Sequence, residues 1–321
     1  MRFARPLVVA VALALVLTPV VALSPGVSAA QAAKKKKGCV QIGVYQDKPE
    51  KSLKKLQKRV GKVGVLSTYL TGGKLLSPAL IKLANKRKVQ LMVTWLPDSG
   101  KDGANQRKYR LTRVSKGKYD RSLKALAKQF KQVKKGVIFR PMPEMNTQWY
   151  AWSGTANKNK PKKYAPAWKR VHKVMRKAGA GKKKVKFLWS PYARSIPDTG
   201  ENALNVYFPG KKFVDYVGAV AYNFGQTPTG LTWTEPVGLF SQAYTTIQAL
   251  AKKPFWIAET ASTQAGGDKG SWIGSLSTLK ETMPNLKGVV WLDAKAGARD
   301  FRIAGKPVNR AFKSLLKKKG C

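Results

Sequence analysis

The sequence predicts a single (β/α)8 barrel over residues 39–321, and two observations lead to this fold class. Eight short runs rich in β-branched and aromatic residues follow one another along the chain, and stretches with helical spacing of apolar residues separate them. Eight such alternations in about 280 residues are typical of a closed barrel of parallel strands. A doubly wound open sheet is the alternative, but no glycine-rich phosphate loop follows the first run.

The carboxyl ends of the predicted strands indicate where a functional site would lie. They occupy residues 40–46, 63–70, 89–96, 137–143, 185–192, 214–223, 255–261 and 289–293. Helical patterns lie between them, for example Leu53, Leu56 and Val60 after the first run, with lysines on the opposite face. We see no internal linker, so we expect one catalytic domain.

A separate segment precedes the barrel. Arg2 and Arg5 come before an apolar stretch from Leu7 to Leu23, and small residues then offer cleavage sites. We interpret residues 1–32 as a signal peptide and residues 33–38, with four lysines, as a basic N-terminal arm. The apolar run is shorter than the ~20 residues of a membrane span, although an uncleaved anchor is the alternative. The mature protein is therefore expected to be secreted, extracellular or cell-wall-associated, without a transmembrane span.

The composition sets limits on function. The 321 residues include 62 Lys and Arg against 15 Asp and Glu, which gives a formal charge of +47, and 43% hydrophobic residues argue against disorder. This charge suggests electrostatic association with anionic cell-wall polymers, although solvated helix faces would also account for it. We do not expect nucleic acid, because no nucleic-acid-binding module is recognisable. With one histidine, His172, and two cysteines, we expect neither a metal site nor a cofactor.

Four carboxylates fall at the predicted carboxyl ends of strands, where barrels carry their reactive residues. Glu144 and Glu259 end the fourth and seventh strands, and Asp47 and Asp293 follow the first and eighth. A pair of carboxylates across a barrel mouth suits glycoside hydrolysis, in which one protonates the leaving oxygen and the other attacks or activates water. The alternative is that each carboxylate caps a helix or pairs with a lysine.

Five segments resemble glycoside hydrolase family 26, whose best-known members are endo-β-1,4-mannanases. The first is residues 140–152, Arg-Pro-Met-Pro-Glu-Met-Asn-Thr-Gln-Trp-Tyr-Ala-Trp, which is similar to the acid/base strand of the family. The others follow in the family's order at residues 187–191, 207–223, 253–260 and 289–293. The resemblance spans nearly the whole predicted domain.

The resemblance implies a role for each matching residue. Glu144 would be the acid/base and Glu259 the nucleophile of a retaining mechanism. The residues that would bind substrate or hold the nucleophile are Arg140, Asn146, Trp149, Tyr222 and Trp291.

One position departs from the family, because Pro143 stands where a histidine usually precedes the acid/base. The expected function is a secreted retaining endo-β-glycanase acting on β-mannan, with mixed-linkage glucan and xylan left open. A catalytically silent polysaccharide-binding barrel and a basic wall-associated adhesion protein are the alternatives.

The two cysteines should meet if the chain is a barrel. Cys39 precedes the first strand and Cys321 ends the chain after the last helix, and in a barrel both points lie at the face opposite the active site. Secretion would supply an oxidising compartment. We therefore predict a disulfide between Cys39 and Cys321, in a protein that we expect to be a monomer.

Overall fold

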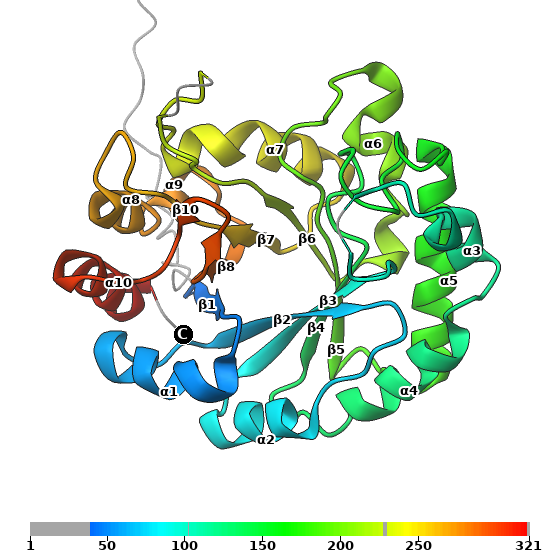
Figure 1. The fold of residues 1–321 in the computed structure, drawn as a ribbon, viewed down its shortest axis with the longest axis horizontal. Coiled ribbons are helices and arrows are strands. Elements are labelled where there is room, and N and C mark those ends of the chain that lie inside the picture. The colour runs from blue at the N-terminus through cyan, green and yellow to red at the C-terminus, as the bar shows by residue number, and fades with distance from the viewer. Residues whose placement is uncertain (1–38, 102, 227–229, 320–321) are drawn as a thin grey trace, which may run out of the picture. The chain divides into compact units, whose positions relative to one another are not determined.

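The computed structural model describes residues 39–101, 103–226 and 230–319, and these form a closed barrel of eight parallel strands in chain order, with helices outside it (Figure 1). The predicted barrel is thus confirmed, and the open-sheet alternative is wrong because β1 pairs with β8 along its whole length. The predicted signal peptide, the basic arm and Cys321 lie outside the described residues.

Each predicted run overlaps one barrel strand, although β8 begins three residues before its run and β2 ends one residue after its run. These strands are β1 (Gln41–Tyr45), β2 (Val65–Thr71), β3 (Gln90–Leu96), β4 (Val137–Pro141), β5 (Val185–Trp189), β6 (Tyr216–Val220), β7 (Phe255–Thr260) and β8 (Leu286–Leu292). A small antiparallel hairpin of β9 (Lys295–Ala296) and β10 (Arg299–Asp300) follows β8. The strands are mostly shorter than predicted at their carboxyl ends, so several candidate site residues lie in loops.

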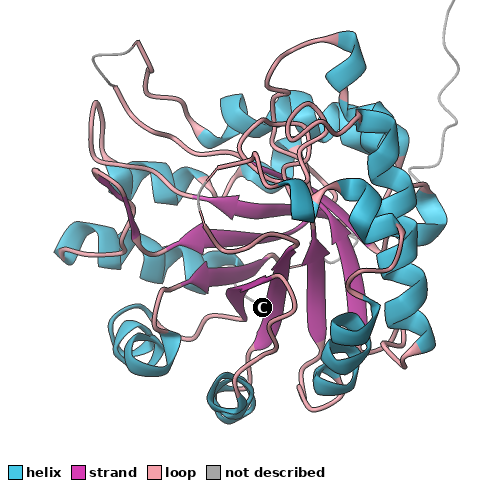
Figure 2. Ribbon diagram, turned by 45° about the vertical axis from the view of Figure 1, so that its right-hand side comes forward, coloured by secondary structure: helices cyan, strands magenta, loops and turns pink. Residues whose placement is uncertain are grey.

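The helices lie around the strands as an outer layer (Figure 2). They are α1 (Pro49–Val60), α2 (Pro78–Arg87), α3 (Leu111–Ser115), α4 (Asp120–Phe130), α5 (Tyr164–Lys177), α6 (Leu204–Tyr207), α7 (Pro236–Leu250), α8 (Lys269–Ser275), α9 (Leu279–Thr282) and α10 (Lys306–Lys319). The described residues also contain four 3₁₀ turns, η1 (Arg107–Tyr109), η2 (Pro161–Lys163), η3 (Gly200–Asn202) and η4 (Lys211–Phe213). Helix α10 contacts both α1 and α8, so the last helix closes the ring.

Helix α1 shows how the sequence produces this layer. Pro49 occupies its first turn, where a missing N–H costs nothing, and Leu53, Leu56 and Val60 are buried at helical spacing. The lysines between them face away from the barrel.

Within the described ranges, no helix combines the length and the apolar character needed to cross a membrane.

The barrel interior is filled by buried apolar side chains. The buried interior cluster consists of Val65, Met92, Ile138, Leu188, Val220, Trp256, Ala258 and Val290. Strand β1 contributes Gly43, where a Cβ would lie 2.7 Å from the Cβ of Val65 and 3.2 Å from a methyl of Val290. Glycine is needed there because its neighbours leave no space for a side chain. The interior is therefore packed, and a reactive site can lie only at the mouth of the barrel.

Candidate active site

The loop after β4 carries Glu144 in a strained backbone. Met142 and Glu144 have φ values of 49° and 53°, in the left-handed region that non-glycine residues rarely adopt. The N–H of Glu144 donates to the carbonyl of Ser190 at 3.0 Å, and the indole of Trp152 donates to the carbonyl of Pro143 at 2.7 Å. These contacts hold the loop in its unusual conformation, as is common at functional sites.

Strand β7 presents Glu259 beside a buried cation. The pairing of β7 with β6 is irregular here, since Ala219 pairs with Ile257 but Val220 pairs with Glu259. Such bulges change the direction of a side chain. The Nη2 atom of Arg140, on β4, lies 2.7 Å from Oε2 of Glu259, and Arg140 also donates through Nε to the hydroxyl of Thr94 at 2.8 Å. A charge pair with these further contacts fixes the carboxylate in one orientation.

Two tyrosines complete the surroundings of Glu259. The hydroxyl of Tyr222, just after β6, donates to Oε1, and the hydroxyl of Tyr69, on β2, donates to Oε2. Burial, and then the negative charge of Glu259, raise the pKa of both hydroxyls well above the usual range, so both tyrosines are neutral donors.

The surroundings of the Glu144 carboxyl raise its pKa. Burial, followed by the negative charge of Glu259, raises the pKa of the Glu144 carboxyl to about 7, while Arg140 and a hydrogen bond from Trp149 act in the opposite direction. The indole Nε1 of Trp149 lies 3.3 Å from Oε2 of Glu144. A carboxyl that keeps its proton near neutrality can act as an acid.

Trp149 also offers a surface for a ligand. Its side chain is 39% exposed, whereas most large apolar side chains in the described residues are buried. Its ring packs edge-to-face against the ring of Tyr192, with 5.4 Å between the ring centres. An exposed indole beside the Glu144 carboxyl is suited to contact with the apolar face of a sugar.

Two predicted site residues, Asn146 and Trp291, have their hydrogen-bond and packing partners away from Glu144 and Glu259. Asn146 is fully buried, and its amide bonds the backbone of Tyr192 and Arg194 in the loop after β5. Trp291 is 1% exposed and packs against Trp272 and Phe312 in the layer between barrel and helices. The placement supports a loop-holding role for Asn146 and a core role for Trp291, rather than direct contact with a sugar.

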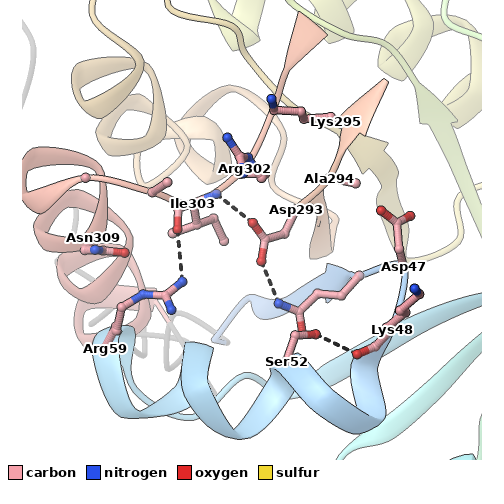
Figure 3. A pocket seen from close by; sticks show the side chains of 13 residues that line it. Asp47, Lys48, Ser52, Arg59, Asp293, Ala294, Lys295, Arg302, Ile303 and Asn309 are labelled. Carbon is pink, nitrogen blue, oxygen red and sulfur yellow. Dashed lines mark hydrogen bonds between the residues drawn. The ribbon is translucent and has the colours of Figure 1, made fainter. Parts of the chain in front are cut away.

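The remaining strand-end aspartates line a separate hollow between the loops after β1 and β8 (Figure 3). Its volume is about 750 Å³. Asp293 accepts hydrogen bonds from the Gln46 amide and the Ile303 N–H, both at 2.7 Å, and Asp47 accepts from the hydroxyl of Tyr45 at 3.1 Å. Both aspartates thus have hydrogen-bond partners in or next to these loops, and these partners are neither helix N-termini nor lysines.

Sequence reasoning missed two polar residues at this end of the barrel. Tyr69 lies near the end of β2, on the same face of the strand as Val65, and this alternation could have indicated that it points inward. Asp98 follows β3 by two residues and is only 8% exposed, and burial raises its pKa. No group of three His, Cys, Asp or Glu suited to a metal occurs among the described residues.

A closed barrel with one glutamate after β4 and a second, cation-paired glutamate on β7 is the arrangement of barrel glycoside hydrolases with two carboxylates. The model of glycosyl hydrolase family 26 matches residues 94–255, half of the chain. The chain therefore belongs to glycosyl hydrolase family 26, which confirms the resemblance seen in the sequence.

Comparison with characterised relatives agrees with this assignment. The chain is 30% identical over 225 residues to endoglucanase H of Acetivibrio thermocellus, and 28% identical over 154 residues to a mannan endo-1,4-β-mannosidase of Bacillus subtilis. These matches cover 68% and 46% of the chain but only 23% and 36% of the two relatives, so the chain spans a minor part of each.

Solved structures share the fold. A family 26 β-mannanase from Bacteroides ovatus superposes with a TM-score of 0.66 at 19% identity, covering 88% of this chain and 90% of that one. The catalytic domain of an endo-β-1,4-mannanase from Bacillus sp. JAMB-750 gives a TM-score of 0.68 at 14% identity, covering 88% and 86%. At these identities the likeness establishes the barrel alone.

Proposed function

We propose that this protein is a retaining endo-β-1,4-glycanase with Glu144 as acid/base and Glu259 as nucleophile. The observation that carries the proposal is the contrast between the two carboxyls. Glu144 is buried with a pKa near 7, whereas Glu259 is paired with the guanidinium of Arg140. One carboxyl that holds a proton, and a second that a guanidinium holds in place, are what the two steps of retaining hydrolysis require.

In the first step, the Glu144 carboxyl gives its proton to the glycosidic oxygen while an oxygen of Glu259 bonds to the anomeric carbon. The bond from that carbon to the glycosidic oxygen breaks, and a glycosyl ester of Glu259 remains. In the second step, the Glu144 carboxylate takes a proton from water, whose oxygen attacks the anomeric carbon. The ester bond then breaks and both carboxyls return to their starting forms.

For the substrate, we propose β-mannan, supported by the family and by the mannosidase relative. A β-glucan is the second candidate, because the relative with the higher identity is an endoglucanase. Pro143 bears on this choice, since a proline next to the acid offers no side-chain hydrogen bond to a sugar.

The experiment is a reducing-end assay on mannan, mixed-linkage glucan and xylan. We expect release from mannan, and Glu144→Gln and Glu259→Gln should each lower it at least 1,000-fold. Glu281→Gln, on the exposed side of α9, is the matched control and should keep full activity. Polysaccharide binding without release of reducing ends from any of the three would favour the silent binding barrel.

We further propose that the protein is secreted and held near anionic wall polymers by its charge. Within the described part of the chain, four arginines form ion pairs with acids, so most of the positive charge is unpaired. Association with purified wall material should fall steeply between 0.1 and about 1 M salt, because exposed charges are screened beyond ~10 Å at 0.1 M. Cleavage of a neutral glycan should depend little on salt, and wall binding that persists at ~1 M salt would argue against this partner.

Secretion can be tested separately by sequencing the amino terminus of the protein recovered from culture medium. Cleavage after Ala29 or Ala32 is expected from the small residues there. A chain that keeps residue 1 and stays with the membrane would support the uncleaved-anchor alternative.

A further inference from the structure

Tyr69 contacts the nucleophile from the opposite side of the barrel. Its hydroxyl donates to Oε2 of Glu259, and its ring packs edge-to-face against Tyr45 at 4.9 Å. The guanidinium of Arg140 lies 5.8 Å from the centre of the same ring. The proposed mechanism uses Arg140, Glu144 and Glu259 and leaves this hydroxyl without a role.

The hydrogen bonds to Glu259 are unevenly shared between its two oxygens. Oε2 accepts from Arg140 and from Tyr69, which occupies both of its in-plane lone pairs. Oε1 accepts only from Tyr222 among the described residues. One lone pair of Oε1 therefore remains available to form a bond.

We propose that Tyr69 is a positioning residue that, together with Arg140, holds Oε2 and makes Oε1 the oxygen that bonds to the anomeric carbon. This inference rests on the proposed function, since it deepens the role of Glu259. Without Tyr69, the carboxylate could rotate and present either oxygen.

Tyr69 should matter most in the second half of the reaction. There, the oxygen of water bonds to the anomeric carbon, its proton passes to Glu144, and the electron pair of the bond from that carbon to Oε1 returns to Glu259. The developing carboxylate accepts a stronger hydrogen bond from Tyr69 than the neutral ester does, because bonds to ionised acceptors are roughly twice as strong. Tyr69 thus favours the departure of Glu259 from the sugar.

The test uses Tyr69→Phe in the full protein, which removes the hydroxyl and keeps the ring that packs on Tyr45. Tyr45→Phe is the matched control, because its hydroxyl donates to Asp47 and not to Glu259. The substrates are the 2,4-dinitrophenyl β-glycosides of mannobiose and cellobiose, whose leaving group needs little help from an acid. Stopped-flow absorbance gives the initial burst and the steady state.

For Tyr69→Phe we expect kcat to fall by about 10- to 100-fold, the range for loss of one hydrogen bond to a charged group. KM should fall in parallel, because the glycosyl-enzyme accumulates, so that kcat/KM changes by less than about threefold. The burst of dinitrophenolate should approach one per enzyme, and Tyr45→Phe should behave as the wild type.

Two results would overturn the inference while leaving the proposed function intact. One is a Tyr69→Phe enzyme with unchanged burst and steady state. The other is a fall in kcat/KM as large as the fall in kcat, which would indicate general disturbance of the site. If the wild type itself released no dinitrophenolate from either glycoside, the proposed function would fail, and the role of Tyr69 with it.

Discussion

The Nη2 atom of Arg140 lies 2.7 Å from Oε2 of Glu259, and neither side chain is accessible beyond a few per cent of its surface. One residue comes from β4 and the other from β7, on opposite sides of the barrel. A buried ion pair of this kind contributes little net stability by itself, but removing one partner leaves an uncompensated charge. The pair therefore links the fold of the barrel mouth to the orientation of the Glu259 carboxylate.

Replacing Arg140 by lysine should lower kcat/KM by at least 100-fold. Lysine keeps a positive charge but cannot donate to Glu259 and Thr94 together from one planar group. Steady-state kinetics on the polysaccharide that wild type cleaves best would check this, with circular dichroism as the control for folding. Activity within a few-fold of wild type would mean that charge alone, without the fixed geometry, is enough.

The pH dependence of kcat/KM should show an alkaline limb with a midpoint near 7, because Glu144 must be protonated to act as acid. The limb reports on the coupled pair of glutamates rather than on one residue in isolation. Since the hydrogen bond from Trp149 lowers the pKa of Glu144, Trp149→Phe should move the midpoint upward. Trp233→Phe, which removes an indole bonded to Glu235, is the control and should leave the midpoint in place.

His172 should make stability depend on pH. Burial, and then the charge of Arg176, lower its pKa to about 4, and its ring packs on Phe187 and Phe213. The unfolded chain binds the proton more readily, so stability is complete above about pH 6.5 and falls as the pH drops towards 4.

Discounted for its partial exposure, this contribution is about 1–2 kcal/mol. Urea unfolding of wild type and His172→Phe at pH 8 and pH 4.5 would measure it, and the variant should lose less stability on acidification. Equal losses in the two proteins would show that the ring is free to protonate in the folded state.

The predicted disulfide between Cys39 and Cys321 remains to be tested, because Cys321 lies outside the described residues. A bridge over about 280 residues would stabilise the fold by at most roughly 5 to 6 kcal/mol in the chain-entropy model. Thiol titration of the denatured, unreduced mature protein should find no free thiol. Two reactive thiols per chain would exclude the bridge.

The order of strands and helices could be predicted from the sequence, because the alternating apolar patterns are local signals. The positions of Glu144 and Glu259 at the carboxyl ends of two strands could be predicted for the same reason. Whether a strand residue points into the barrel or towards the helices could not be predicted from the sequence. In Val289-Val290-Trp291-Leu292 every residue is apolar, so nothing in the run indicates that Val290 faces the interior and Trp291 faces the helices.

Contacts made by loops could not be predicted from the sequence either. The amide of Asn146 is bonded to Tyr192, which lies 46 residues later in the loop after β5, and this contact depends on how β4 and β5 are paired in space. Tyr69 was missed because its partner, Glu259, lies 190 residues away along the chain. Both residues become meaningful only once the barrel brings distant segments together.

The central claim, that Glu259 forms a covalent bond to the sugar, is tested most directly by trapping that bond. The protein would be incubated with 2,4-dinitrophenyl 2-deoxy-2-fluoro-β-mannobioside or the corresponding cellobioside, then digested and analysed by mass spectrometry. We predict one glycosyl unit per chain, attached to Glu259, and none on Glu259→Gln. A label on Glu144, or hydrolysis of the natural polysaccharide with inversion at the anomeric carbon, would contradict the account.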